Sequence, residues 1–208
     1  MYLYNYFLVI IIVLVVIIYY FHFMYLKKNN SEMVILQKNS PNKILIEDLL
    51  ESKSPSIFTG VIENWEVKDD KNITKKEYDY NTEIFNIPLC ILKKYKHIIL
   101  PPQKKTNILK ELSIRKLLFI LEGDIRLFLF PPDQKIIPNE KNKNISKYNF
   151  FKDKEQFKNI KYLEIKMSEG NIIYIPKDWW YCYRVETYTE ILSVINESIL
   201  SWPLKKFL

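Results

Sequence analysis

The chain of 208 residues contains no alanine, three glycines, two cysteines and two histidines. Cys90 and Cys182 are too few for a disulfide framework, and their separation fits no zinc-binding spacing. With only His22 and His97 available, chemistry that needs several histidines in one site is difficult. The length suits one folded domain with its own core.

Charge is missing from one end of the chain. Residues 1–26 contain no Asp, Glu, Lys or Arg, although the whole chain carries 31 basic and 24 acidic residues. As a helix, the apolar run at 6–26 would match the hydrocarbon thickness of a bilayer. No basic residue precedes this run and no small-residue cleavage pattern follows it, which argues against a cleaved signal peptide. The sequence therefore predicts a retained transmembrane anchor over 1–26, with residues 6–26 in the lipid.

The residues after this run predict the orientation of the anchor. Lys27 and Lys28 follow it directly, and the positive-inside rule places such a flank on the cytosolic side. We therefore expect a single-pass membrane protein with a cytosolic C-terminal domain, in a virion or host membrane if the source is viral. His22, near the end of the run, is interpreted as a neutral interfacial histidine. Residues 27–40 are predicted to be a polar linker, and 41–208 the folded domain.

The folded domain is predicted to be mainly β with a few helices. Residues 43–52 have the apolar spacing of a short amphipathic helix, and 107–121 fits either a helix or a strand. Short segments of β-type composition, separated by turn residues, are predicted to be strands at 55–60, 125–130, 163–167, 171–175, 180–185 and 191–195. This pattern favours a sandwich or barrel. The Lys- and Asn-rich region at 138–161 is predicted to be a solvated insertion.

The net charge of +7 comes mainly from scattered lysines. Scattered lysines with little arginine are typical of a solvated surface, so no specific nucleic-acid partner is expected. Attraction to anionic lipid headgroups is the simpler use of this charge. The excess of Lys, Asn and Ile over Ala, Gly and Arg indicates an AT-rich genome, such as that of a large DNA virus or another AT-rich microbe.

Three segments carry a resemblance to a known family. They read PSIFTGVIENW at 55–65, GDIRLFLFPPDQ at 123–134 and EGNIIYIPKDWW at 169–180. In this order they resemble the cupin-like JmjC hydroxylases, and are most similar to the asparaginyl hydroxylase that acts on hypoxia-inducible factor. The resemblance implies a double-stranded β-helix (jelly roll) over roughly 41–203. It also implies a set of core-structural positions: Trp65, Gly123, Pro131, Pro132, Gly170, Pro176, Trp179 and Trp180.

The chemistry of this family requires Fe(II), held by two histidines and a carboxylate, with 2-oxoglutarate as cosubstrate. The resemblance puts the first two ligand positions near Lys110 and Leu112, and the second histidine at Tyr181. The position of the cosubstrate lysine falls at Ile125, beside Arg126. None of these residues suits the family's chemistry, so the five are predicted to form a vestigial pocket. We expect the phenol of Tyr181 to occupy the vacated iron site.

Three functions remain open from the sequence. The first is a single-pass membrane protein that displays a catalytically inactive cupin-like domain, without cofactors, in a structural or scaffolding role towards an unknown protein partner. The second is an Fe(II)- and 2-oxoglutarate-dependent hydroxylase with non-standard ligands such as Cys90 or Cys182. The third is a membrane-surface recruitment module that uses a lysine-rich face.

Overall fold

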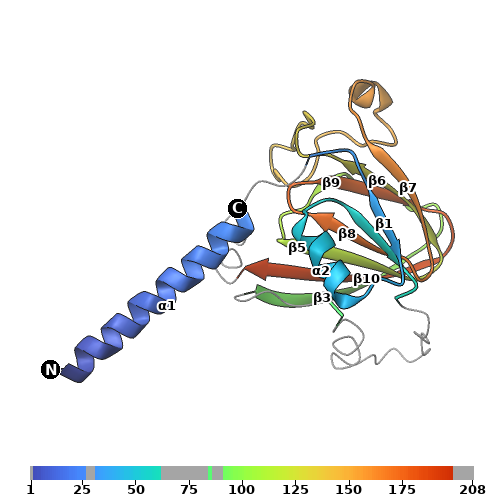
Figure 1. The fold of residues 1–208 in the computed structure, drawn as a ribbon. Helices are drawn as coiled ribbons and strands as arrows, with labels where there is room; N and C mark the ends of the chain where they lie inside the picture. Colours follow the sequence, from blue (N-terminus) through green and yellow to red (C-terminus); the bar gives the residue numbers. More distant parts are fainter. Residues whose placement is uncertain (1, 27–30, 62–83, 86–90, 199–208) are drawn as a thin grey trace.

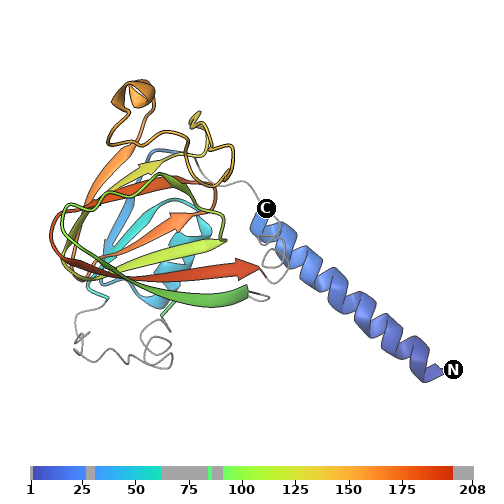
Figure 2. The ribbon, with the colours of Figure 1, turned by 180° about the vertical axis from the view of Figure 1, so that it is seen from behind.

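The computed structural model describes residues 2–26, 31–61, 84–85 and 91–198 (Figure 1). Within these ranges the chain is mainly β, as predicted, and its strands form two sheets. The longest helix, α1 (Tyr2–Leu26), extends away from the sheets in both views (Figures 1 and 2).

The larger sheet has six strands. Their order is β1 (Leu36–Asn39), β2 (Ser56–Thr59), β8 (Ile172–Pro176), β5 (Arg115–Glu122), β10 (Thr189–Ser198) and β3 (Ile91–Leu100). The β1–β2 pair is parallel and the other pairs are antiparallel. The sheet thus begins inside the segment 27–40 that was predicted to be a linker, because β1 pairs along β2. Strand β3 has no counterpart among the strands predicted from the sequence.

The smaller sheet has four strands. Their order is β4 (Leu109–Lys110), β9 (Trp180–Val185), β6 (Asp124–Phe130) and β7 (Leu163–Ser168), and all of its pairs are antiparallel. The region 107–121, which the sequence left between helix and strand, forms β4 and β5. At the start of β6, Gly123 has φ of +81°, and a Cβ there would lie 2.0 Å from the carbonyl oxygen of Tyr188. Only glycine fits this turn.

The two sheets enclose the central core. Strand β5 explains why the sheets pack on both sides of it, because apolar side chains lie on both of its faces. Leu118 and Ile120 face the central cluster, which also contains Ile125, Leu127 and Leu129 of the smaller sheet. Apolar residues on both faces are expected of a strand that is covered on both sides.

The outer face of the larger sheet is covered by α2 (Lys43–Glu51), which was predicted at 43–52. The helix begins at Asn42, whose side-chain oxygen accepts a hydrogen bond from the backbone N–H of Leu45 at 2.9 Å. Its apolar residues Ile46, Leu49 and Leu50 pack against the sheet, together with Leu117, Phe119 and other residues of the second cluster.

The outer face of the smaller sheet is covered by the region 138–161, which was predicted to be a solvated insertion. This prediction is wrong in part, because aromatic residues of the region pack against the sheet. Phe150 lies 4.9 Å from Phe128 and 5.3 Å from Phe130 between ring centroids. Phe157, in the short 3-10 helix η1 (Lys154–Phe157), is also buried in this third cluster. The aromatic residues are interspersed among Lys and Asn, which hid them from composition alone.

Helix α1 contains an apolar segment, Tyr6–Met24, with a mean hydropathy of 2.9 and none of it buried. It is long and apolar enough to cross a membrane, a property that signal sequences and some core helices share. Near its C-terminal end, His22 Nδ1 lies 2.9 Å from Ser198 Oγ, at the end of β10. Helix α1 therefore meets the sheets at the end where β10 stops and β3 starts (Figure 1).

Candidate functional site

A lysine lies inside the sandwich. In β5 the side chains alternate, so Lys116 falls on the same face as Leu118 and Ile120, which belong to the central cluster. Its side chain is only 13% exposed. An ammonium group on the inner face of a sheet requires partners of opposite charge or strong hydrogen-bond acceptors.

Lys116 finds its partners on the side of the smaller sheet. Its Nζ donates to the phenol oxygen of Tyr181 at 2.5 Å, and Tyr181 comes from β9 in the opposite sheet. The same Nζ lies 3.1 Å from Oε2 of Glu111, whose side chain is 7% exposed. The ammonium also lies 4.8 Å from the centre of the Tyr181 ring. Lys116 thus links the two sheets by a buried ion pair and a hydrogen bond.

Glu111 is held in place by its surroundings. Its backbone N–H donates to the carbonyl oxygen of Trp179 at 2.8 Å, and its own carbonyl accepts from the N–H of Asp178 at 2.7 Å. Its carboxylate Oε1 accepts from the backbone N–H of Ser113 at 2.7 Å and from the Ser113 hydroxyl. We call Glu111, Ser113, Lys116 and Tyr181 the interior lysine cluster.

The protonation states in this cluster follow from burial and charge. Burial alone would lower the pKa of Lys116, but the charge of Glu111 and the contact with Tyr181 raise it well above its ordinary value. Burial raises the pKa of Tyr181, although the Lys116 charge opposes this. Burial also raises the pKa of nearby Tyr183 to about 12. The raised pKa values keep Lys116 protonated and Tyr181 neutral at neutral pH, so Lys116 is a poor base or nucleophile.

The structure brings together two of the five residues predicted to form a vestigial pocket. Ile125 and Tyr181 both belong to the central cluster. Lys110 instead forms an ion pair with Asp178 at 3.2 Å, and its strand neighbour Leu109 pairs with Tyr181. Arg126 makes its contacts outside the central cluster, and Leu112 is half-buried between β4 and β5.

The positions predicted to be core-structural lie in different places. Trp179 is fully buried in the central cluster. Trp180 is also buried, but in the third cluster on the outer face of the smaller sheet and not in the central cluster. The alternation of β9 explains this, because Trp180 and Tyr181 must point in opposite directions. Pro131 and Pro176 are buried, Pro132 and Gly170 are half-buried, and Trp65 lies outside the described residues.

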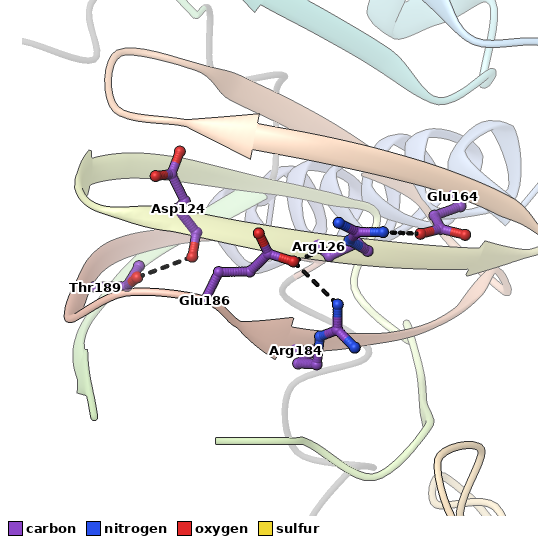
Figure 3. A network of polar contacts seen from close by, with 6 residues as sticks. All are labelled: Asp124, Arg126, Glu164, Arg184, Glu186 and Thr189. Atoms are coloured by element: carbon purple, nitrogen blue, oxygen red, sulfur yellow. Dashed lines mark hydrogen bonds and ion pairs between the residues drawn. The ribbon is translucent and has the colours of Figure 1, made fainter. Parts of the chain in front are cut away.

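A second group of charges lies on the outer face of the smaller sheet (Figure 3). Arg126 contacts Glu164 at 2.9 Å and Glu186 at 3.0 Å, and Arg184 contacts the same oxygen of Glu186 at 3.1 Å. The hydrogen bond from Arg184, together with Arg126, holds the pKa of Glu186 below its usual range. These side chains are 25–42% exposed. We call Arg126, Glu164, Arg184 and Glu186 the outer arginine network.

Across the described ranges, no three His, Cys, Asp or Glu side chains lie close enough together to hold a metal ion. His97 lies 3.2 Å from Glu190 near the far end of β3. Cys182 is buried in the third cluster, and burial raises the pKa of its thiol. The other cysteine, Cys90, lies outside the described residues.

Three members of the interior lysine cluster, Glu111, Ser113 and Lys116, were not singled out from the sequence. One signal was present: residues 117–121 are all apolar, and Lys116 lies an even number of positions from Leu118 and Ile120, as residues on one face of a strand do. If 115–122 had been assigned as a strand, the alternation would have placed this lysine inside. The uncertainty between helix and strand over 107–121 hid it.

The sequence matches no protein-family model and no curated protein. Among solved structures, it is similar to salicylate 1,2-dioxygenase from Pseudaminobacter salicylatoxidans (10% identity, TM-score 0.33, 50% of this chain and 20% of that one). It is also similar to an oxalate decarboxylase variant from Bacillus subtilis (12%, 0.34, 51% and 21%) and to TDP-quinovose 3,4-ketoisomerase from Campylobacter jejuni (13%, 0.34, 51% and 62%). The chain spans about a fifth of the length of the dioxygenase and the decarboxylase. At these TM-scores the likenesses establish neither a shared fold nor a shared function.

Proposed function

We propose that this chain is a single-pass membrane protein that displays a catalytically inactive cupin-like domain with a structural or interaction role. The observation that carries the proposal is the interior lysine cluster. Tyr181, which the sequence resemblance aligns with an iron-binding histidine, holds the ammonium of Lys116 at 2.5 Å. The proposal is that this ammonium stands where the family's chemistry would require a divalent metal.

The residues of the cluster do not suit an iron site of the family type. Such a site needs two neutral imidazoles and a carboxylate on one face of a pocket, with open positions for cosubstrate and oxygen. The cluster offers one carboxylate, Glu111, which is already paired with Lys116 and hydrogen-bonded to Ser113. An ammonium at 3.1 Å from that carboxylate repels Fe(II) and competes with it for the same oxygen atoms. The vestigial pocket is thus proposed to be closed by Lys116.

A double-stranded β-helix related to the JmjC hydroxylases is the proposed origin of the domain. The proposal draws on the three sequence motifs and on the two mainly antiparallel sheets that enclose one core. The likenesses to the dioxygenase and the decarboxylase are too weak to contribute. Once catalysis is lost, a packed core must persist while a polar site is free to change, which fits a lysine in place of metal ligands.

Helix α1 is the proposed anchor. Its apolar side chains are exposed along Tyr6–Met24, which would be unfavourable in water and is expected in lipid. The lysines that follow the span, Lys27 and Lys28, favour a cytosolic domain. The domain would then act through its outer surfaces, towards a protein partner whose identity is open, from a cellular, host or virion membrane.

The absence of family chemistry can be tested directly on the full chain in detergent micelles. Fe(II) is added without oxygen, the protein is desalted and its metal content is measured; 2-oxoglutarate and oxygen are then supplied and succinate is quantified. We expect no iron above the level of a heat-denatured control, and no succinate. An established 2-oxoglutarate oxygenase, treated identically, shows that the procedure retains iron. One iron per chain together with succinate formation would instead make the protein a hydroxylase with non-standard ligands.

A further inference from the structure

Ser193 carries a buried hydroxyl for which the described residues offer no hydrogen-bond partner. It lies in β10 and is 1% exposed. Its Oγ is the one buried side-chain oxygen or nitrogen within the described ranges that lacks a partner. Buried polar groups are almost always hydrogen-bonded, either to protein or to an ordered water. The hydroxyl therefore calls for a further molecule inside the protein.

Ser193 faces the interior of the sandwich. In the antiparallel register it lies opposite Leu118 of β5. Residues directly opposite each other share one face of a sheet, and Leu118 belongs to the central cluster. Strand alternation agrees, because Ile191, two residues earlier in β10, belongs to the same cluster. Ser193 thus lies on the same inner face as Lys116.

Lys116 is a diagonal neighbour of Ser193 on this face. It pairs with Ile195, two residues along β10 from Ser193, and diagonal neighbours lie about 7–8 Å apart between Cα atoms. The ammonium of Lys116 has three N–H groups. Within the described part of the chain they meet two acceptors, the phenol of Tyr181 and the carboxylate of Glu111. One N–H is left for a third acceptor.

Tyr183 brings a further polar group from the opposite sheet. It lies two residues from Tyr181 in β9, is 7% exposed and belongs to the central cluster. The charge of Lys116 acts on its phenol, so the two groups are near each other. Lys116, Ser193 and Tyr183 thus contribute three polar groups to one part of the interior.

Water suits these groups better than an ion does. Glu111 already neutralises Lys116, so another anion would add an unpaired charge to the interior, and the ammonium would repel a metal ion. A water molecule both accepts and donates, and its hydrogen bonds of about 2.8 Å let it join polar atoms about 5–6 Å apart. Buried waters typically make about three hydrogen bonds to groups that would otherwise be unsatisfied.

We infer that a water molecule is bound inside the sandwich, where it accepts a hydrogen bond from Lys116 and is hydrogen-bonded to the Ser193 hydroxyl, with the Tyr183 phenol as third partner. The inference goes beyond the proposed function, because it requires neither a membrane anchor nor a loss of catalysis. The water would connect β10 to the interior lysine cluster. Ser193 would then stabilise the fold only in the presence of Lys116.

Urea unfolding of the full chain in mild detergent tests this dependence. Ser193→Ala removes a hydroxyl that is hydrogen-bonded to the water, so the equilibrium constant for unfolding should rise about fivefold, as for the loss of one net hydrogen bond. In Lys116→Met the hydroxyl has already lost its bridge to the ammonium. There the same substitution should leave the constant unchanged or lower it, because an unsatisfied buried hydroxyl is removed.

Ser56→Ala is the matched control. Ser56 is fully buried in β2, which β8 separates from β5, and its hydroxyl donates to the carbonyl oxygen of Ser54 at 3.0 Å. Its loss should raise the constant by the same factor with or without Lys116. If Ser193→Ala leaves the unaltered chain equally or more stable, the hydroxyl has no partner and the inference fails. An equal loss in Lys116→Met would also overturn it, because the partner would then be independent of Lys116.

NMR observes the water directly, and it decides the question if Lys116→Met does not fold. In the full chain with ¹⁵N-labelled lysine side chains, the ammonium protons of Lys116 should show a cross-peak to a long-lived water. In Ser193→Ala these protons should exchange with solvent about fivefold faster, because the water loses one of its hydrogen bonds. Ser56→Ala should leave the exchange rate unchanged. Absence of the cross-peak, or a rate that Ser193→Ala does not alter, would refute the bound water.

Discussion

The interior lysine cluster and the outer arginine network are built from the same kinds of groups in different surroundings. Each contains cations and carboxylates about 3 Å apart. Lys116 and Glu111 are 13% and 7% exposed, whereas Arg126 and Glu164 are 37% and 42% exposed. Water screens the outer charges and can replace any partner that is removed, but the interior offers no such replacement. The same chemistry should therefore be essential to stability in one place and dispensable in the other.

The largest effect is expected from Lys116→Met. This substitution keeps the apolar stem but leaves the carboxylate of Glu111 buried without its cation, which should lower the free energy of unfolding by about 3–5 kcal/mol. Urea unfolding of the full chain in mild detergent, followed by tryptophan fluorescence, measures the change. An unchanged midpoint would show that Lys116 is solvated, and that the interior lysine cluster contributes no more to stability than the outer arginine network.

The double variant Lys116→Met/Glu111→Gln serves as the control for this prediction. Without the carboxylate no buried charge remains, so the double variant should recover most of the lost stability. If it is as unstable as Lys116→Met alone, the loss comes from packing and not from an unpaired charge.

The second prediction concerns alkaline pH. The pKa values of Lys116 and Tyr181 are raised in the folded chain, so above a pH of about 10 the folded state binds more protons than the unfolded state. This contribution to stability is complete below about pH 10 and is lost as pH rises, by about 1.4 kcal/mol per pH unit for each group. Urea midpoints at a series of pH values should fall above that point, and less steeply in Lys116→Met. A flat profile would contradict the assignment.

A smaller effect is expected from Tyr181→Phe. The ring remains in the central cluster, and only the hydrogen bond from Lys116 to the phenol oxygen is lost, while the ion pair with Glu111 stays. The expected loss is about 1.5–3 kcal/mol, typical of a hydrogen bond to a charged group. The same urea unfolding measures it. A loss as large as that of Lys116→Met would mean that the phenol, and not Glu111, is the main partner.

The smallest effect is expected in the outer arginine network. Arg126→Gln removes contacts to Glu164 and Glu186 (Figure 3), but both carboxylates are accessible to water. The urea midpoint should stay within experimental error, at low and at high salt. A clear, salt-sensitive loss would show that the exposed network contributes to stability, and the contrast with the interior would fail.

The sequence was sufficient to predict a mainly β domain because most of its strands have a strong local signature. Alternation at 163–167 and the apolar run at 125–130 predicted β7 and β6. Strand β3 was missed because it is an edge strand, with lysines at Lys93, Lys94 and Lys96 that interrupt its apolar pattern. Edge strands often carry charge, so their sequences resemble those of loops.

The site was harder to predict than the fold. The resemblance led to Tyr181 and Ile125, which do lie in the central cluster, but it placed the other positions at Lys110 and Leu112. In the register of β4 with β9, the partner of Tyr181 is Leu109 and not Lys110. The side chain that reaches Lys116 is that of Glu111, one residue further along the chain than Lys110. A shift of one residue reverses the direction of every side chain. The contact between Lys116 and Tyr181 joins two sheets, and no local pattern encodes it.

The most direct test of the account is the titration of Lys116 itself. In the full chain with ¹⁵N-labelled lysine side chains, the Nζ resonance of Lys116, assigned through Lys116→Met, is followed by NMR as pH is raised. We predict an ammonium that stays protonated well above the reference pKa of about 10.4, because Glu111 and Tyr181 hold it. Glu111→Gln should lower this pKa, and Arg126→Gln should leave it unchanged. An ordinary or lowered pKa for Lys116 in the unaltered chain would contradict an interior closed by a permanent cation.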